Sequence, residues 1–143
     1  MLKLTELSQS TTDTDDIVTL PFEYRQKSRL LSQTDKGAKI GIFLPRGQTL
    51  QHGYILTGQD DYRVKVQAAA EYLSVVRTDD ALLFSRACYH LGNRHIPLQI
   101  LPDELRFQTD HVLDQMLVGL GLTVHHESLP FEPEQGAYHN HGH

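Results

Sequence analysis

Cysteine, long apolar runs and clusters of basic residues are missing or nearly missing from this 143-residue chain. The one cysteine, Cys88, excludes an internal disulfide and favours a reducing compartment. No window approaches the roughly 18 apolar residues of a membrane-spanning helix, and the opening MLKLTELSQSTTDTDD has no apolar core of a signal peptide. We therefore expect a cytoplasmic protein. With 13 Lys and Arg against 18 Asp and Glu, the net charge of −5 gives no reason to expect nucleic acid or a membrane as partner.

The common enzyme signatures are also absent from the sequence. It contains no glycine-rich phosphate loop, no HExxH, no CxxC and no GxSxG. The paired carboxylates in GQDDY (58–62) have the composition of a turn. A small metallohydrolase would need a general base paired with its histidines, and the sequence offers none. We predict that the chain is not an enzyme.

The first half of the chain has the alternating pattern of short strands. Ile40, Ile42 and Leu44 fall on one face of such a run. Turn signals separate the runs, and no helical stripe precedes about residue 79, which favours a small antiparallel barrel or sandwich. We predict a barrel-like all-β domain over residues 1–71. Its strands are expected in the runs LKLTEL (2–7), DIVTLPF (16–22), KIGIFL (39–44) and YRVKVQ (62–67).

The second half predicts the element order β-α-β-β-α-β over residues 72–134, which is the ferredoxin-like arrangement. The first helix would be capped by Thr78 or Asp79 and end near Gly92, and the second would be capped by Thr109 or Asp110. Strands are expected at 72–77, 96–101, 104–108 and 122–129, and Gly121 would end the second helix. The fold class is therefore α+β, followed by a disordered, histidine-bearing tail at 135–143.

Histidine is the unusual residue: nine are present, and five fall in the last 19 positions. In an extended backbone His139, His141 and His143 point the same way, and Gly142 lets the chain bend around one ion. Neutral imidazole suits zinc, copper, iron and nickel, so the tail is a candidate metal ligand set. Two interpretations other than metal binding are open for these histidines: they are the remains of an expression tag, or they belong to a solvated polar tail.

Two further histidines are candidates in the ferredoxin-like domain. His95 lies in a Gly-Asn-Arg-His loop. Spacing alone favours a structural role there, as a histidine hydrogen-bonded to the backbone. In a two-fold dimer, however, a metal on the axis would receive one His95 imidazole from each copy. His111 lies in the first turn of a helix, whose dipole favours the neutral ring, although an exposed first-turn residue explains it equally well. Other residues are interpreted as structural or solvated: His52, Cys88, His125 and His126.

Three segments of the sequence resemble a known family. They are YHLGNRHIPLQI (89–100), ELRFQTDHVLDQML (104–117) and LPFEPEQGAYHNHGH (129–143), and the likeness extends through RQKSRL, IGIFLPRGQTL and AAAEYLSVV in the first half. The chain is identified as resembling the UreE-type urease accessory proteins, which are nickel metallochaperones. The resemblance implies a homodimer that binds Ni(2+) as cargo and helps deliver it to apo-urease. It also implies His95 as the central ligand at the dimer interface and His111 as a further ligand.

The resemblance also implies partners, namely the urease accessory GTPase and the complex of urease apoprotein with accessory proteins. It further implies that the domain over residues 1–71 binds a partner or peptide. Some members place a histidine where this chain has Thr109, so a peripheral site using that position would be weaker or missing. Three tail imidazoles would supply ligands for about one ion. The Irving–Williams order predicts that an open histidine site also takes Cu(2+) or Zn(2+) in vitro. The alternative functions are a nickel, copper or zinc storage or buffering protein without a delivery partner, and a protein-interaction module.

Overall fold

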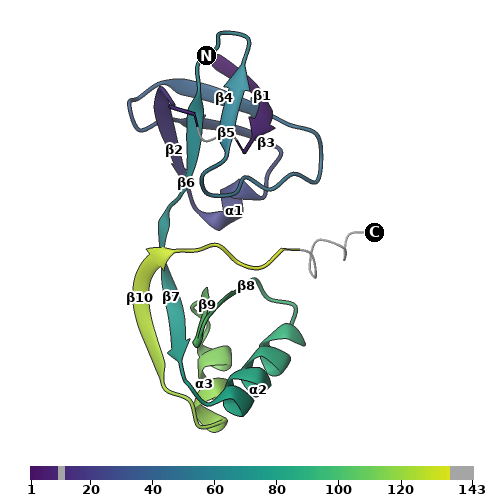
Figure 1. Ribbon diagram of the computed structural model, residues 1–143, viewed down its shortest axis with the longest axis vertical. Helices are drawn as coiled ribbons and strands as arrows, with labels where there is room; N and C mark the ends of the chain where they lie inside the picture. The colour runs from purple at the N-terminus through teal and green to yellow at the C-terminus, as the bar shows by residue number, and fades with distance from the viewer. Residues whose placement is uncertain (10–11, 136–143) are drawn as a thin grey trace. The chain divides into compact units, whose positions relative to one another are not determined.

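The computed structural model describes residues 1–9 and 12–135 and divides the chain into two compact units. The first unit is Met1–Ala69, and the second begins at Ala70. Each has a sheet of its own (Figure 1). Of the helices in the described residues, none has the length and apolar character needed to cross a membrane.

The first unit is a six-stranded, nearly closed, barrel-like sheet with the strand order β2-β6-β5-β1-β4-β3. Ile40, Ile42 and Leu44 are all buried in its core, as the alternation in KIGIFL predicts. The strands are β1 (Leu2–Ser8), β2 (Asp16–Leu20), β3 (Arg29–Gln33), β4 (Lys39–Phe43), β5 (Ile55–Gly58) and β6 (Val64–Ala68).

Three details of this unit differ from the sequence-based expectation. The sheet is mixed rather than antiparallel, because β1 pairs with β4 and β2 with β6 in parallel. Strands β3 and β5 were not predicted, since their apolar residues are few and do not alternate over a long run. A one-turn helix, α1 (Phe22–Arg25), follows Pro21, which is a common start for a helical turn because proline needs no backbone donor.

Two buried charged side chains connect the loops of the first unit. Asp16 accepts hydrogen bonds from its neighbour Ile17 N (2.8 Å), from Lys36 N (3.2 Å) and from the Tyr62 hydroxyl (2.9 Å). Burial raises the pKa of Asp16, but these bonds and one from Thr34 stabilise the carboxylate, and the net pKa lies below its ordinary value. Arg25 is equally buried, and its Nε donates to the Leu20 carbonyl at 3.0 Å.

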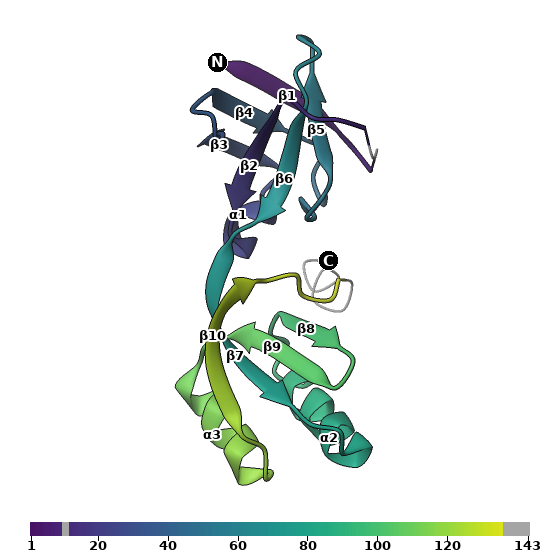
Figure 2. The ribbon, with the colours of Figure 1, turned by 60° about the vertical axis from the view of Figure 1, so that its left-hand side comes forward.

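The second unit has the predicted β-α-β-β-α-β order and the strand order β10-β7-β9-β8, which confirms the ferredoxin-like fold. All three strand pairings are antiparallel. Helices α2 and α3 pack against one face of this sheet, where the core joins residues of both helices to Val76, Leu105 and Phe107 (Figure 2). The elements are β7 (Ala70–Arg77), α2 (Ala81–Gly92), β8 (Leu98–Leu101), β9 (Glu104–Gln108), α3 (His111–Gly119) and β10 (Val124–Pro130).

Aspartates begin both helices of the second unit. The predicted caps Thr78 and Asp79 are wrong for α2: the cap is Asp80, whose carboxylate accepts from Leu83 N at 3.0 Å. The stretch Thr78-Asp79-Asp80 holds three residues of capping type, so the sequence does not decide among them. For α3 the cap is Asp110, one of the two predicted, and it accepts from Val112 N and Leu113 N.

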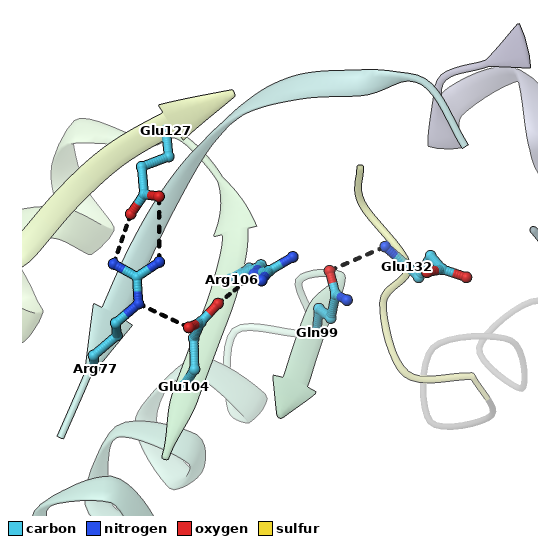
Figure 3. Close-up of polar contacts among 6 residues, drawn as sticks. All are labelled: Arg77, Gln99, Glu104, Arg106, Glu127 and Glu132. Carbon is cyan, nitrogen blue, oxygen red and sulfur yellow. Dashed lines mark hydrogen bonds and ion pairs between the residues drawn. The ribbon is translucent and has the colours of Figure 1, made fainter. Parts of the chain in front are cut away.

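Ion pairs connect three neighbouring strands on the surface of this unit. Arg77 on β7 reaches Glu127 on β10 at 2.7 Å and Glu104 on β9 at 2.8 Å, while Glu104 also pairs with Arg106 (Figure 3). Such pairs add little stability when exposed, but opposite charges on adjacent strands favour one register. The tail predicted at 135–143 lies outside the described residues, except for Gln135.

Candidate metal centre

His95 lies at a sharp bend between α2 and β8. Helix α2 ends at Gly92, and the His95 N–H then donates to the Gly92 carbonyl at 3.0 Å. His95 itself has a φ of 55°, the left-handed region that residues with a Cβ seldom occupy, and its side chain is exposed. Strained positions of this kind cluster at functional sites. The sequence placed His95 in a loop but held no signal for this backbone conformation.

An apolar hollow of about 180 Å³ opens beside His95. It is bounded by the end of α2, the His95 bend and the edge strand β8. Two of its lining residues, His95 and Glu134, carry potential metal ligands, and Cys88 adds a thiol. The remaining residues are Gly92, Ile96, Leu98 and Ile100. A ligand-bearing loop beside an accessible apolar surface suits a contact with a second protein surface.

Cys88 is half-buried and packs against the core of the second unit, as its place on the apolar stripe of the helix predicts. Burial raises the pKa of the Cys88 thiol above its ordinary value. The thiolate is the form that binds metal, so at neutral pH this side chain is held in its non-ligating form. Its position next to the hollow was not evident from the sequence, where it reads only as a small core residue.

His111 is the first residue of α3 and its side chain is exposed. Thr109, just before the cap, donates its hydroxyl proton to the Tyr72 carbonyl at 3.3 Å. The threonine is therefore bound to strand β7 by its own hydroxyl.

His126 is paired with a carboxylate on α3. Its Nε2 lies 2.8 Å from Asp114 Oδ2, and the other oxygen of Asp114 accepts from the buried Ser74 hydroxyl at 2.7 Å. Tyr72 lies alongside, with ring centroids 5.6 Å apart. This agrees with the structural interpretation of His126, although the sequence did not identify Asp114 as its partner. His52 is also structural, because its Nδ1 accepts from Ala68 N at 3.1 Å.

Within residues 1–9 and 12–135, no three His, Cys, Asp or Glu side chains gather closely enough to hold a metal ion. His95 and His111 are therefore not members of a three-ligand centre formed by the described part of one chain. The tail candidates His139, His141 and His143 lie outside the described residues. The five residues predicted as metal ligands remain a prediction.

Comparison with known protein families gives two matches that together span the chain. Residues 3–69 match the UreE urease accessory protein, N-terminal domain, and residues 71–143 match the UreE urease accessory protein, C-terminal domain. The two matches meet near the junction of the two units at Ala69–Ala70.

Curated relatives agree with these matches. The chain is 54% identical to the urease accessory protein UreE of Alkalilimnicola ehrlichii over 138 residues, which are 96% of this chain and 85% of that protein. It is 49% identical to the protein of the same name from Escherichia coli O157:H7, over 100% of this chain and 96% of the relative. The Pseudomonas putida protein is 54% identical, over 88% of this chain and 78% of its own length. With an exposed histidine bend, a ferredoxin-like domain and this likeness over its whole length, the chain belongs to the UreE family of urease accessory proteins.

Proposed function

We propose that this protein is a nickel metallochaperone. Two copies would bind Ni(2+) between their His95 side chains at a homodimer interface and donate it to apo-urease during assembly of the urease active site. The observation that carries the proposal is the exposed His95 bend beside an apolar hollow, in a chain of the UreE family.

The need for a second copy follows from the ligand count. In the described part of one chain His95 belongs to no group of three ligands, whereas a two-fold axis near the bend doubles every donor. The surface of the hollow is suited to such a contact, because its lining is mostly apolar and Ile100 in it is 42% exposed. Burying apolar area of this kind would favour association.

Hand-over requires that the ion be held by few fixed ligands. Nickel accepts nitrogen and oxygen ligands in square-planar or octahedral surroundings, so ligands can be replaced one at a time. We propose that His139, His141 and His143 complete the sphere and that His111 offers a secondary site. The recipients would be the urease accessory GTPase and the complex of urease apoprotein with accessory proteins, and Cu(2+) or Zn(2+) would also bind in vitro.

The test is the variant His95→Ala, with His125→Ala as control, because His125 is an exposed histidine of the same unit that does not line the hollow. We expect His95→Ala to lower nickel affinity by about tenfold or more, and the control to match the parent. Isothermal titration, read with the mass of the oligomer, measures this. If His95→Ala binds nickel like the parent, the bridging role of His95 is wrong.

Delivery is tested separately from binding. At limiting nickel, apo-urease mixed with its accessory proteins should gain more activity with the parent chain than with His95→Ala. A chain that binds nickel but does not increase urease activation would instead be a storage or buffering protein.

A further inference from the structure

We propose that the carboxylate of Glu134 is an oxygen ligand of the same nickel ion that His95 binds. This inference rests on the proposed function and adds a residue, and a ligand type, to that site. Glu134 lines the hollow beside His95, although the two are 39 positions apart in the sequence.

The backbone around Glu134 is hydrogen-bonded to the second unit. Phe131, directly after β10, is fully buried, and Pro133 is buried as well. Between them the Glu132 N–H donates to the side-chain carbonyl of Gln99 on β8 at 3.1 Å (Figure 3). The segment is therefore joined to β8 by a hydrogen bond, and within it Phe131 and Pro133 are buried while Glu132 and Glu134 are exposed.

Glu134 itself is fixed to the edge strand that bounds the hollow. Its N–H donates to the Leu98 carbonyl at 2.7 Å, and Leu98 is the first residue of β8. Because β8 is the last strand of the sheet, this bond uses a backbone group that no further strand occupies. The His95 bend comes just before the same strand, so both residues lie near the start of β8.

The chemistry of the two groups is complementary. An imidazole nitrogen and a carboxylate oxygen together give the mixed sphere that divalent nickel accepts. In the proposed dimer each residue occurs twice, so His95 and Glu134 would supply four donors. The anionic oxygens would also offset the charge of the cation next to an otherwise apolar surface.

The experiment compares Glu134→Gln with Glu132→Gln by nickel titration of the full chain. The two substitutions remove the same charge two positions apart and preserve the backbone hydrogen bonds, but only Glu134 lines the hollow. We expect Glu134→Gln to lower nickel affinity by about tenfold and Glu132→Gln to leave it within about twofold. In a His95→Ala background, Glu134→Gln should cause little further loss, because both residues act on one ion.

A second measurement needs no substitution. On adding nickel to the unmodified protein, the side-chain carboxyl ¹³C signal of Glu134 should shift or broaden with the first equivalent, and that of Glu132 should not. Equal behaviour of the two glutamates in both measurements would overturn the ligand role. The ligand role would also be overturned if Glu134→Gln lowered nickel affinity by the same factor in the parent and in the His95→Ala background. If His95→Ala itself leaves nickel binding unchanged, the proposed function fails instead, so the two failures are distinguishable.

Discussion

The two units of the chain differ in where some of their charged and histidine side chains lie. In the first unit Asp16 and Arg25 are buried, and His52 accepts a hydrogen bond from the backbone, so these groups are committed to the fold. In the second unit His95 and His111 are exposed, and an apolar hollow lies beside His95. Buried groups that hydrogen-bond within a fold are poor ligands for an incoming ion, whereas exposed side chains on a rigid scaffold are accessible to it. The second unit is therefore the better candidate for metal exchange.

The largest expected effect concerns the core that supports the second unit. Phe107 on β9 is fully buried among residues of α2 and α3, and Phe107→Ala should destabilise the unit by about 3–5 kcal/mol because it leaves a cavity. Hydrogen exchange should show lost protection in β7–β10. Protection in β1, β4 and β6 should persist, because the hydrophobic core of the first unit is a separate cluster. An equal loss of exchange protection in both units would show that they unfold together, and that the two cores are not energetically separate.

An intermediate effect is expected at Asp16. Asp16→Asn replaces a buried carboxylate that accepts several hydrogen bonds, and we expect a loss of about 2 kcal/mol at pH 7 by urea unfolding. Nickel affinity should not change, because Asp16 belongs to the first unit. A changed nickel affinity would contradict the proposal that the second unit alone binds the metal.

The effect of Asp16 should also depend on pH. Its pKa in the folded protein lies below the ordinary value, so its contribution is fully present above the unfolded pKa of about 3.9 and is lost as the pH falls through the folded pKa. The stability difference between parent and Asp16→Asn should therefore shrink in acid, below about pH 4. A difference that is constant down to pH 2 would mean that the carboxylate's charge is not what stabilises the loops.

The smallest expected effect is at the cap of α3. Asp110→Ala removes the acceptor for Val112 N and Leu113 N and should cost about 1 kcal/mol. Asp110→Asn keeps a capping oxygen and should be nearly neutral. Thermal unfolding of the two variants separates lost capping from lost charge. If both are equally destabilised, the charge near the helix N-terminus is the larger contribution.

Much of the second unit could be predicted because its local signals agree with one another. The stripe of Val112, Leu113, Met116, Leu117 and Leu120 marked a helix, and its buried members Leu113 and Leu117 are core residues of α3. The run at 104–108 coincides with β9. In the first unit, the alternation in KIGIFL correctly predicted β4. Strands β3 and β5 were not predicted, because short strands in a mixed sheet are stabilised by their neighbours rather than by their own sequence pattern.

The candidate site was only partly visible from the sequence. The loop position of His95 follows from Gly92 and the residues after it, and the family resemblance gave it a ligand role. Glu134, in the FEPE run at 131–134, was not predicted to line the same hollow as His95, because nothing local relates it to a loop 39 positions earlier. Likewise, the pairing of His126 with Asp114 joins β10 to α3, and neither pattern contains that contact.

By itself the sequence determined the α+β class, the ferredoxin-like order of the second unit and the number of histidines present. These features can be predicted because periodicity, helix caps and composition depend on residues close together in the chain. The tertiary structure alone decided that the chain after β10 returns to the edge strand β8, and that His95 takes a left-handed conformation beside a hollow. Those features depend on contacts between distant segments, whose free energy is set by packing and hydrogen bonding once the sheet has formed. A histidine in a loop is common, but a glutamate 39 positions later that lines the same hollow is a property of the fold.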